Sequence, residues 1–95
     1  MTDNRQMLID VILCTLDSEH KLKECLDALT AEIPVRRIIL VDGGSKDTTL
    51  DIARQYDQVD IYTRPELNRG QALQFAFAQV QCGKAAFVAD YEVQL

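Results

Sequence analysis

Four short apolar runs, separated by segments with helical spacing, organise the chain. The runs at residues 7–14, 35–41, 59–62 and 85–89 have the length and character of buried strands. Between them, apolar residues recur every three or four positions over residues 18–30, 48–56 and 71–81, which predicts three amphipathic helices. Each connection is long enough for a helix and too long for a hairpin, so the alternation indicates parallel strands.

This alternation predicts an α/β fold, a Rossmann-like parallel sheet with helices on both faces. Right-handed crossovers and the doubly wound precedent favour the strand order 3-2-1-4, in which the winding reverses between the first and fourth strands. That reversal leaves a ligand crevice at the C-terminal ends of the strands. The 95 residues are expected to form a single domain over 1–95. The apolar residues expected to pack the third helix are Ala72, Leu73, Ala76, Phe77 and Val80.

Composition and charge narrow the classes of partner. The net charge of −5 works against non-specific binding to nucleic acid or to an anionic membrane. We expect a cytoplasmic protein, because no window reaches the roughly 18 apolar residues of a membrane span and the N-terminus lacks a signal profile. The thiols of Cys14, Cys25 and Cys82 lie in apolar runs and are interpreted as buried, and His20 as exposed.

Carboxylates follow three of the predicted strands. Asp17 follows the first, Asp42 ends the second, and Asp90 and Glu92 end the fourth, so all four should reach one rim of the sheet. Asp90 and Glu92 are two positions apart, which puts both side chains on one side of an extended segment. They could share Mg²⁺ or Mn²⁺ with phosphate oxygens. Taken singly, each carboxylate is more typical of a helix cap or a solvated turn than of a ligand site, and the convergence of four is what favours a site.

Two further segments carry candidate chemistry. In residues 42–45, Gly43 permits close approach of a ligand to the backbone, and the carboxylate of Asp42 could accept hydrogen bonds from a base or ribose. The alternative is a helix-entry turn. In residues 68–70, Arg69 stands at the start of the third helix, where free N–H groups favour phosphate. The alternative there is a solvated surface arginine.

Four segments, in order, resemble one known family. Residues 41–49 resemble the Val-Asp-Asp/Gly-Gly-Ser-Thr-Asp-Gly-Thr signature of family 2 glycosyltransferases with the GT-A fold. Residues 11–17 are similar to the opening Val-Ile-Ile-Pro-Thr-Tyr-Asn of that family, and residues 68–72 to its Asn-x-Gly segment. Residues 87–94 are similar to its apolar strand followed by Asp-x-Asp. The resemblance extends over residues 8–94.

The resemblance implies the N-terminal, nucleotide-sugar-binding half of a GT-A fold. By it, Asp42 would contact the nucleobase, and Thr15 and Asp17 would line the nucleotide pocket. Asp90 would reach the ribose or the metal, and Glu92 would bind the metal, which is Mg²⁺ or Mn²⁺. The donor implied is a nucleotide-sugar such as a UDP- or GDP-sugar.

The chain also departs from the family pattern. Cys14, Leu16 and Asp17 stand where the family has Pro, Tyr and Asn, and Tyr91-Glu92 replace the last two residues of Asp-Ala-Asp. Family members are longer, and their second half brings the acceptor site and the catalytic base. No catalytic residue is therefore assigned here, and the chain is expected to bind a donor without completing transfer to an acceptor hydroxyl alone.

Three hypotheses for function result. The first is the donor-binding half of a glycosyltransferase. The second is a non-catalytic relic of the fold that acts as a binding or dimerisation module, with a second copy or another chain covering the apolar edge of the fourth strand. The third is a receiver-like phosphorylation switch, which the position of Lys84 disfavours because this lysine precedes the fourth strand instead of following it.

Overall fold

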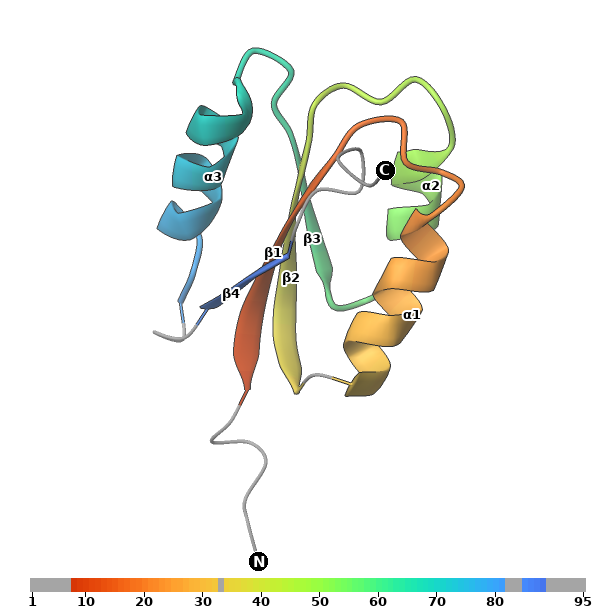
Figure 1. The fold of residues 1–95 in the computed structure, drawn as a ribbon, viewed down its shortest axis with the longest axis vertical. Helices are drawn as coiled ribbons and strands as arrows, with labels where there is room; N and C mark the ends of the chain where they lie inside the picture. The colour runs from red at the N-terminus through yellow and green to blue at the C-terminus, as the bar shows by residue number, and fades with distance from the viewer. Residues whose placement is uncertain (1–7, 33, 82–84, 89–95) are drawn as a thin grey trace, which may run out of the picture.

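The computed structural model describes residues 8–32, 34–81 and 85–88. Within these ranges the chain forms four strands and three helices that alternate along the sequence (Figure 1). The elements in chain order are β1 (Ile9–Thr15), α1 (Leu22–Glu32), β2 (Val35–Asp42), α2 (Thr49–Ala53), β3 (Val59–Thr63), α3 (Arg69–Ala78) and β4 (Ala85–Val88).

The described strands form one parallel sheet in the order β3-β2-β1-β4. Thr15 at the end of β1 is the register partner of Asp42 at the end of β2, which in turn pairs with Thr63 at the end of β3. The C-terminal ends of β1, β2 and β3 therefore share one edge of the sheet. The predicted α/β class with a parallel sheet is confirmed.

Helices cover both faces of the sheet, because the central strand β1 is apolar on both sides. Its side chains alternate: Val11 and Leu13 pack with α1 and α2, whereas Ile12 and Cys14 pack with α3. Figure 1 shows α3 on one side of the strands and α1 and α2 on the other. Cys14 and Cys25 are buried thiols outside any disulfide among the described residues, as predicted, and Cys82 lies outside the described residues.

Helix α3 differs from its predicted form in extent and packing. It begins at Arg69, two residues before the predicted start, because Asn68 and Gln71 form a capping box. The side chain of Phe77 is 52% exposed, so its predicted core role is wrong. Phe75 packs against the α3 face of the core instead, with its ring 5.1 Å from that of Tyr62 in an edge-to-face arrangement.

The other two helices are shorter than their apolar spacing predicts. Helix α1 begins at Leu22, and its first turn is preceded by a turn in which the Ser18 carbonyl accepts hydrogen bonds from the Lys21 and Leu22 amides. Helix α2 ends at Ala53, after which the chain turns toward β3. Both differences fall at the ends of the elements, where local spacing carries least information.

A buried ion pair interrupts the apolar start of β1. Asp10 is fully buried, and the Arg36 guanidinium donates to both its oxygens, Nε to Oδ1 at 2.7 Å and Nη2 to Oδ2 at 2.9 Å. The pairing register shifts here: Ile9 is paired with Val35, and Asp10 with Arg37. The shift leaves Arg36 as an extra residue in β2, which re-aims its side chain toward Asp10.

Candidate functional site

The predicted carboxyl-end edge of the sheet brings the β1–α1 and β2–α2 loops together. The hydroxyl of Thr15 donates to Oδ1 of Asp42 at 2.7 Å, and the Gly43 amide donates to the Thr15 carbonyl at 2.9 Å. The parallel pairing of β1 with β2 thus continues one residue past the end of β2. Thr15 and Gly43 are held side by side as a result.

Asp42 is fully buried, and its carboxylate organises the turn that follows β2. Oδ2 accepts the amides of Gly44 at 2.9 Å and Ser45 at 2.7 Å. Oδ1 accepts the hydroxyls of Ser45 at 2.6 Å and Thr15 at 2.7 Å. These four donors from described residues match the capacity of a carboxylate, so the helix-entry turn is formed as one alternative predicted. A base could bond to Asp42 only by displacing one of them.

Asp17 is a second connection between the β1–α1 loop and the β2–α2 loop. Its backbone has φ +49°, the one left-handed non-glycine conformation among the described residues, and aspartate tolerates this region better than most residues. Its amide donates to the Ser45 hydroxyl at 2.7 Å, and its Oδ1 accepts the Lys46 amide at 2.8 Å. The side chain is bonded to the neighbouring loop rather than to the first turn of α1.

A second set of contacts extends this connection to the start of α2. Glu19 Oε1 accepts the amide and the hydroxyl of Thr48, and these bonds hold the pKa of Glu19 below its ordinary value. Asp47 accepts the amides of Glu19 and Thr49 and the hydroxyl of Thr49. Burial works to raise the pKa of Asp47, but the hydrogen bonds outweigh it and the pKa is lowered. The Ser18 amide donates to the Thr49 hydroxyl at 2.7 Å.

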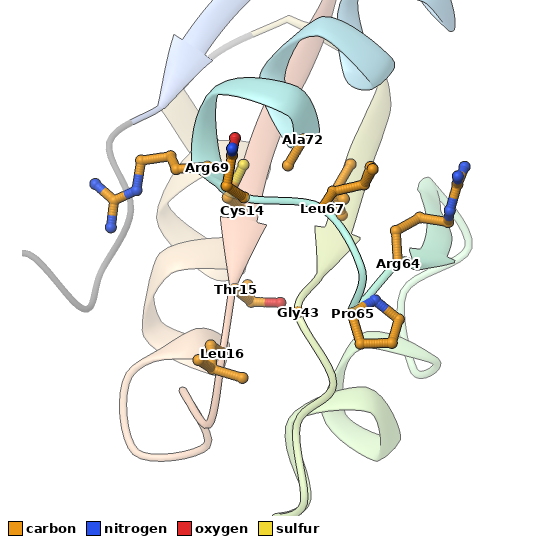
Figure 2. Close-up of a pocket in the computed structure, with 11 residues that line it drawn as sticks. Cys14, Thr15, Leu16, Gly43, Arg64, Pro65, Leu67, Arg69 and Ala72 are labelled. Atoms are coloured by element: carbon orange, nitrogen blue, oxygen red, sulfur yellow. The ribbon is translucent and has the colours of Figure 1, made fainter.

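A cavity of about 330 Å³ opens at this edge between the two loops and the start of α3 (Figure 2). In Figure 2, Leu16 and Pro65 lie on either side of Gly43, and Arg64 and Arg69 lie at opposite ends of the cavity. Of the described residues that line it, two are arginines and none carries a carboxylate. The lining residues are Cys14, Thr15, Leu16, Val41, Gly43, Arg64, Pro65, Leu67, Asn68, Arg69 and Ala72.

The two arginines are placed by different contacts. The guanidinium carbon of Arg64 lies 4.6 Å from the centre of the Phe75 ring, a cation–π contact, and its Nε donates to Glu66 at 2.6 Å. Arg69 is the first residue of α3, where the positive end of the helix dipole lies. Two arginines therefore line the cavity, one of them paired with Glu66, in a chain whose net charge is −5.

Comparison with known proteins identifies the family. The model of "Glycosyl transferase family 2" matches residues 10–89, which is most of the chain. The chain belongs to glycosyl transferase family 2. No curated protein matches it.

A solved structure supports the fold of this glycosyl transferase family 2 chain. Glucosyl-3-phosphoglycerate synthase from Mycobacterium tuberculosis, solved with Mn²⁺, uridine diphosphate and glucosyl-3-phosphoglycerate, superimposes with a TM-score of 0.70 and 24% sequence identity. The match covers 88% of this chain and 33% of that protein. The fold is therefore that of a GT-A glycosyltransferase, and the chain corresponds to about a third of this neighbour's length.

The structure of the family 2 chain separates the predicted site residues into three groups. Thr15, Gly43 and Arg69 line the cavity. Asp17 and Asp42 lie at the same edge, but neither is among the described residues that line the cavity. The carboxylates of both accept backbone amides of the β2–α2 loop. The remaining two, predicted to hold a metal, are Asp90 and Glu92, which lie outside the described residues.

Several lining residues were missed by the sequence reasoning. Arg64 and Pro65 directly follow β3, the same kind of position that drew attention to the carboxylates after the other strands. Leu16 was noted only as a departure from the family pattern, although its apolar side chain in a polar loop is itself a signal.

The described residues contain no group of three or more His, Cys, Asp or Glu side chains arranged to hold a metal ion. The described helices are all too short or too polar to cross a membrane.

Proposed function

We propose that this chain binds the nucleoside diphosphate part of a sugar donor in the cavity at the carboxyl edge of the sheet. Residues 1–95 would serve as the donor-binding half of a glycosyltransferase that transfers the sugar to an acceptor hydroxyl. Thr15 and Gly43 would contact the nucleotide, and Arg69 would bind a phosphate oxygen. No catalytic base is assigned within the chain. Such a base must lie within hydrogen-bond reach of the acceptor hydroxyl, and the family resemblance implies that the acceptor site belongs to the second half of the longer members.

One observation carries the proposal: the charge of the cavity opposes the charge of the chain. The sequence has fifteen acidic residues against ten basic ones, yet the described lining contains Arg64 and Arg69 and no carboxylate. A lining with no carboxylate and two arginines, of which Arg64 is paired with Glu66, is suited to a diphosphate, which arginine binds through charge-assisted hydrogen bonds. Family membership and the position at the carboxyl ends of parallel strands support the same ligand.

A divalent cation, Mg²⁺ or Mn²⁺, is proposed as the partner of the diphosphate. Asp90 and Glu92 would hold it, and two carboxylates completed by phosphate oxygens are a donor set that suits both ions. Strand β4 runs parallel to β1, with Leu13 paired to Val88, so the C-terminal end of β4 faces the same edge as the C-terminal end of β1. Such an ion stabilises the charge that develops on a departing diphosphate.

Titration calorimetry tests the proposal with the 95-residue chain, UDP and GDP, each with and without Mn²⁺. We expect one nucleotide to bind, with affinity reduced roughly tenfold by Arg69→Ala, the cost of a charge-assisted hydrogen bond. Arg54→Ala is the matched control, because Arg54 is exposed on the other side of the sheet and pairs with Asp51. Asp90→Ala should abolish the effect of Mn²⁺.

Two results would count against the proposal. Absence of binding by either nucleotide to a folded chain would remove it and would favour the alternative, a relic that acts as a binding or dimerisation module. Binding that Arg69→Ala and Asp90→Ala leave unchanged would show that the nucleotide occupies some other place. Sedimentation velocity at high concentration would then distinguish a self-associating module from a monomer.

A further inference from the structure

One wall of the cavity consists of Thr15, Leu16 and Gly43, which come from two different loops. Leu16 is 41% exposed, and a Cβ built on Gly43 would stand 3.6 Å from its Cδ1 atom. The Leu16 side chain therefore lies directly against the backbone of the other loop. The shape of this wall depends on how firmly the β1–α1 loop is held to the β2–α2 loop.

A closed ring of hydrogen bonds surrounds Leu16. The Asp17 amide donates to the Ser45 hydroxyl, which donates to Asp42 Oδ1, and the same oxygen accepts the Thr15 hydroxyl. The three bonds measure 2.7, 2.6 and 2.7 Å. Thr15 and Asp17 are the chain neighbours of Leu16, so both ends of this residue are tied to the β2–α2 loop. The other members of the ring, Asp17, Asp42 and Ser45, are not among the described residues that line the cavity.

Asp17 links the two loops through two properties, its backbone conformation within the ring and a further side-chain bond outside it. Its left-handed backbone, φ +49°, belongs to the geometry in which its amide meets Ser45, and its Oδ1 receives the Lys46 amide at 2.8 Å. Neither property depends on a negative charge. An asparagine side chain offers the same acceptor oxygen and adopts the left-handed region as readily, whereas alanine offers no acceptor and adopts that region at a cost.

We infer that Asp17 is a positioning residue for the nucleotide pocket: it fixes the Thr15–Leu16–Gly43 wall by linking the two loops, and the nucleotide does not bind its carboxylate. The inference rests on the proposed function only in taking a nucleotide as the ligand. It differs from the role that the family resemblance implies, in which Asp17 lines the pocket. The two roles make opposite predictions for replacement by asparagine.

The decisive comparison is the affinity for UDP with Mn²⁺ of Asp17→Ala, Asp17→Gly and Asp17→Asn. Asp17→Ala should weaken binding roughly tenfold, the effect of losing a hydrogen bond that orders the site. Asp17→Asn should rescue binding to within about threefold of the wild type, because the acceptor is restored without the charge. Asp17→Gly accepts the left-handed backbone without strain, so it keeps the chain folded should alanine not, and it should still bind weakly.

Asp27→Ala is the matched control for loss of one negative charge. Asp27 lies on the exposed surface of α1 and is bonded to Lys23 and Tyr56, so its removal should leave the affinity unchanged. If Asp17→Asn binds as weakly as Asp17→Ala, the carboxylate charge contacts the ligand or its cation and the inference is overturned. If Asp17→Ala binds like the wild type, the link is not needed and the inference is equally overturned.

Measurements without ligand keep this test separate from the test of the proposed function. In the free chain, the Lys46 amide should exchange slowly with solvent in the wild type and in Asp17→Asn, and fast in Asp17→Ala and Asp17→Gly. The Leu16 methyl resonances should shift only in the last two. If UDP and GDP fail to bind the wild type, the proposed function fails. The positioning role then stands or falls on whether Asp17→Ala changes the Lys46 and Leu16 signals.

Discussion

The ion pair between Asp10 and Arg36 offers the sharpest test of how this fold is held together. Asp10 is completely buried in the central strand β1, while the Arg36 side chain is 32% exposed. The carboxylate accepts two bonds from the guanidinium, and Oδ2 also accepts the Gln81 amide at 2.9 Å. The pair thus joins β1, β2 and the segment that follows α3.

The substitution Asp10→Ala removes all three of these bonds at once. Hydrogen bonds to a charged group contribute about 1.5–3 kcal/mol each. Water can reach the exposed third of Arg36 and recover part of that loss, so the contributions do not simply add. We expect the free energy of unfolding to fall by about 3 kcal/mol, the low end of the range for breaking a buried pair. For a chain of this size that is a large part of a total of about 5–14 kcal/mol.

Urea unfolding followed by far-UV circular dichroism measures the change. With a slope of about 1.5 kcal/mol per M, the midpoint for Asp10→Ala should fall by about 2 M. Asp60→Ala is the control, because Asp60 pairs with the adjacent Arg37 but is 40% exposed, and should cost less than about 1 kcal/mol. Asp10→Leu combined with Arg36→Met should recover most of the loss. The reasoning is refuted if Asp10→Ala costs no more than Asp60→Ala.

Three further predictions concern the loops at the cavity. Gly44 has φ +100°, so Gly44→Ala should lower the free energy of unfolding by about 1–2 kcal/mol, measured by thermal melts. Gly43→Ala should cost under about 1 kcal/mol in these melts, because a Cβ there would meet its nearest atom only at 3.6 Å. Thr15→Val keeps the shape but removes a buried donor, so urea titration should show a loss of about 1–2 kcal/mol, and no loss would exclude the bond. The pKa values of Glu19 and Asp47 are lower in the folded state than their ordinary values of 4.5 and 3.8. The contribution of these two groups to stability is therefore complete when the pH is above those ordinary values. Stability should therefore fall as the pH drops below about 4.5, and Glu19→Gln should flatten this profile.

Much of the fold could be read from local pattern. The apolar runs that predicted the strands correspond to β1, β2, β3 and β4 to within about two residues at each end, because a strand buried on both faces must be apolar at nearly every position. The position of the site followed from parallel topology, which brings the carboxyl ends of the strands to one edge. Of the residues predicted from this edge, Thr15, Gly43 and Arg69 do line the cavity.

Partners far apart in the sequence could not be read in this way. Asp17 and Asp42 were selected as ligand-binding groups, and in the structure their oxygens are bonded to the amides of Lys46, Gly44 and Ser45. A carboxylate that follows a strand has the same local signature whether it faces a ligand or a neighbouring loop. Local pattern also failed to show which phenylalanine of α3 packs on the sheet. Phe75 and Phe77 are two positions apart, so their side chains point in directions that differ by more than half a turn, and only the packing decides which one is buried.

The amino-acid sequence was sufficient to establish the family, the alternation of strands and helices and the edge at which a ligand would bind. Those properties depend on hydrophobic periodicity and on motifs that are short and local. Which carboxylates remain available to a ligand depends on the pairing register. A shift of one residue in that register brings Arg36 to Asp10, 26 positions away, and the alignment of Thr15 with Asp42 closes the ring around Leu16. Such contacts form only when distant segments are aligned, because a hydrogen bond requires its two atoms within about 3 Å.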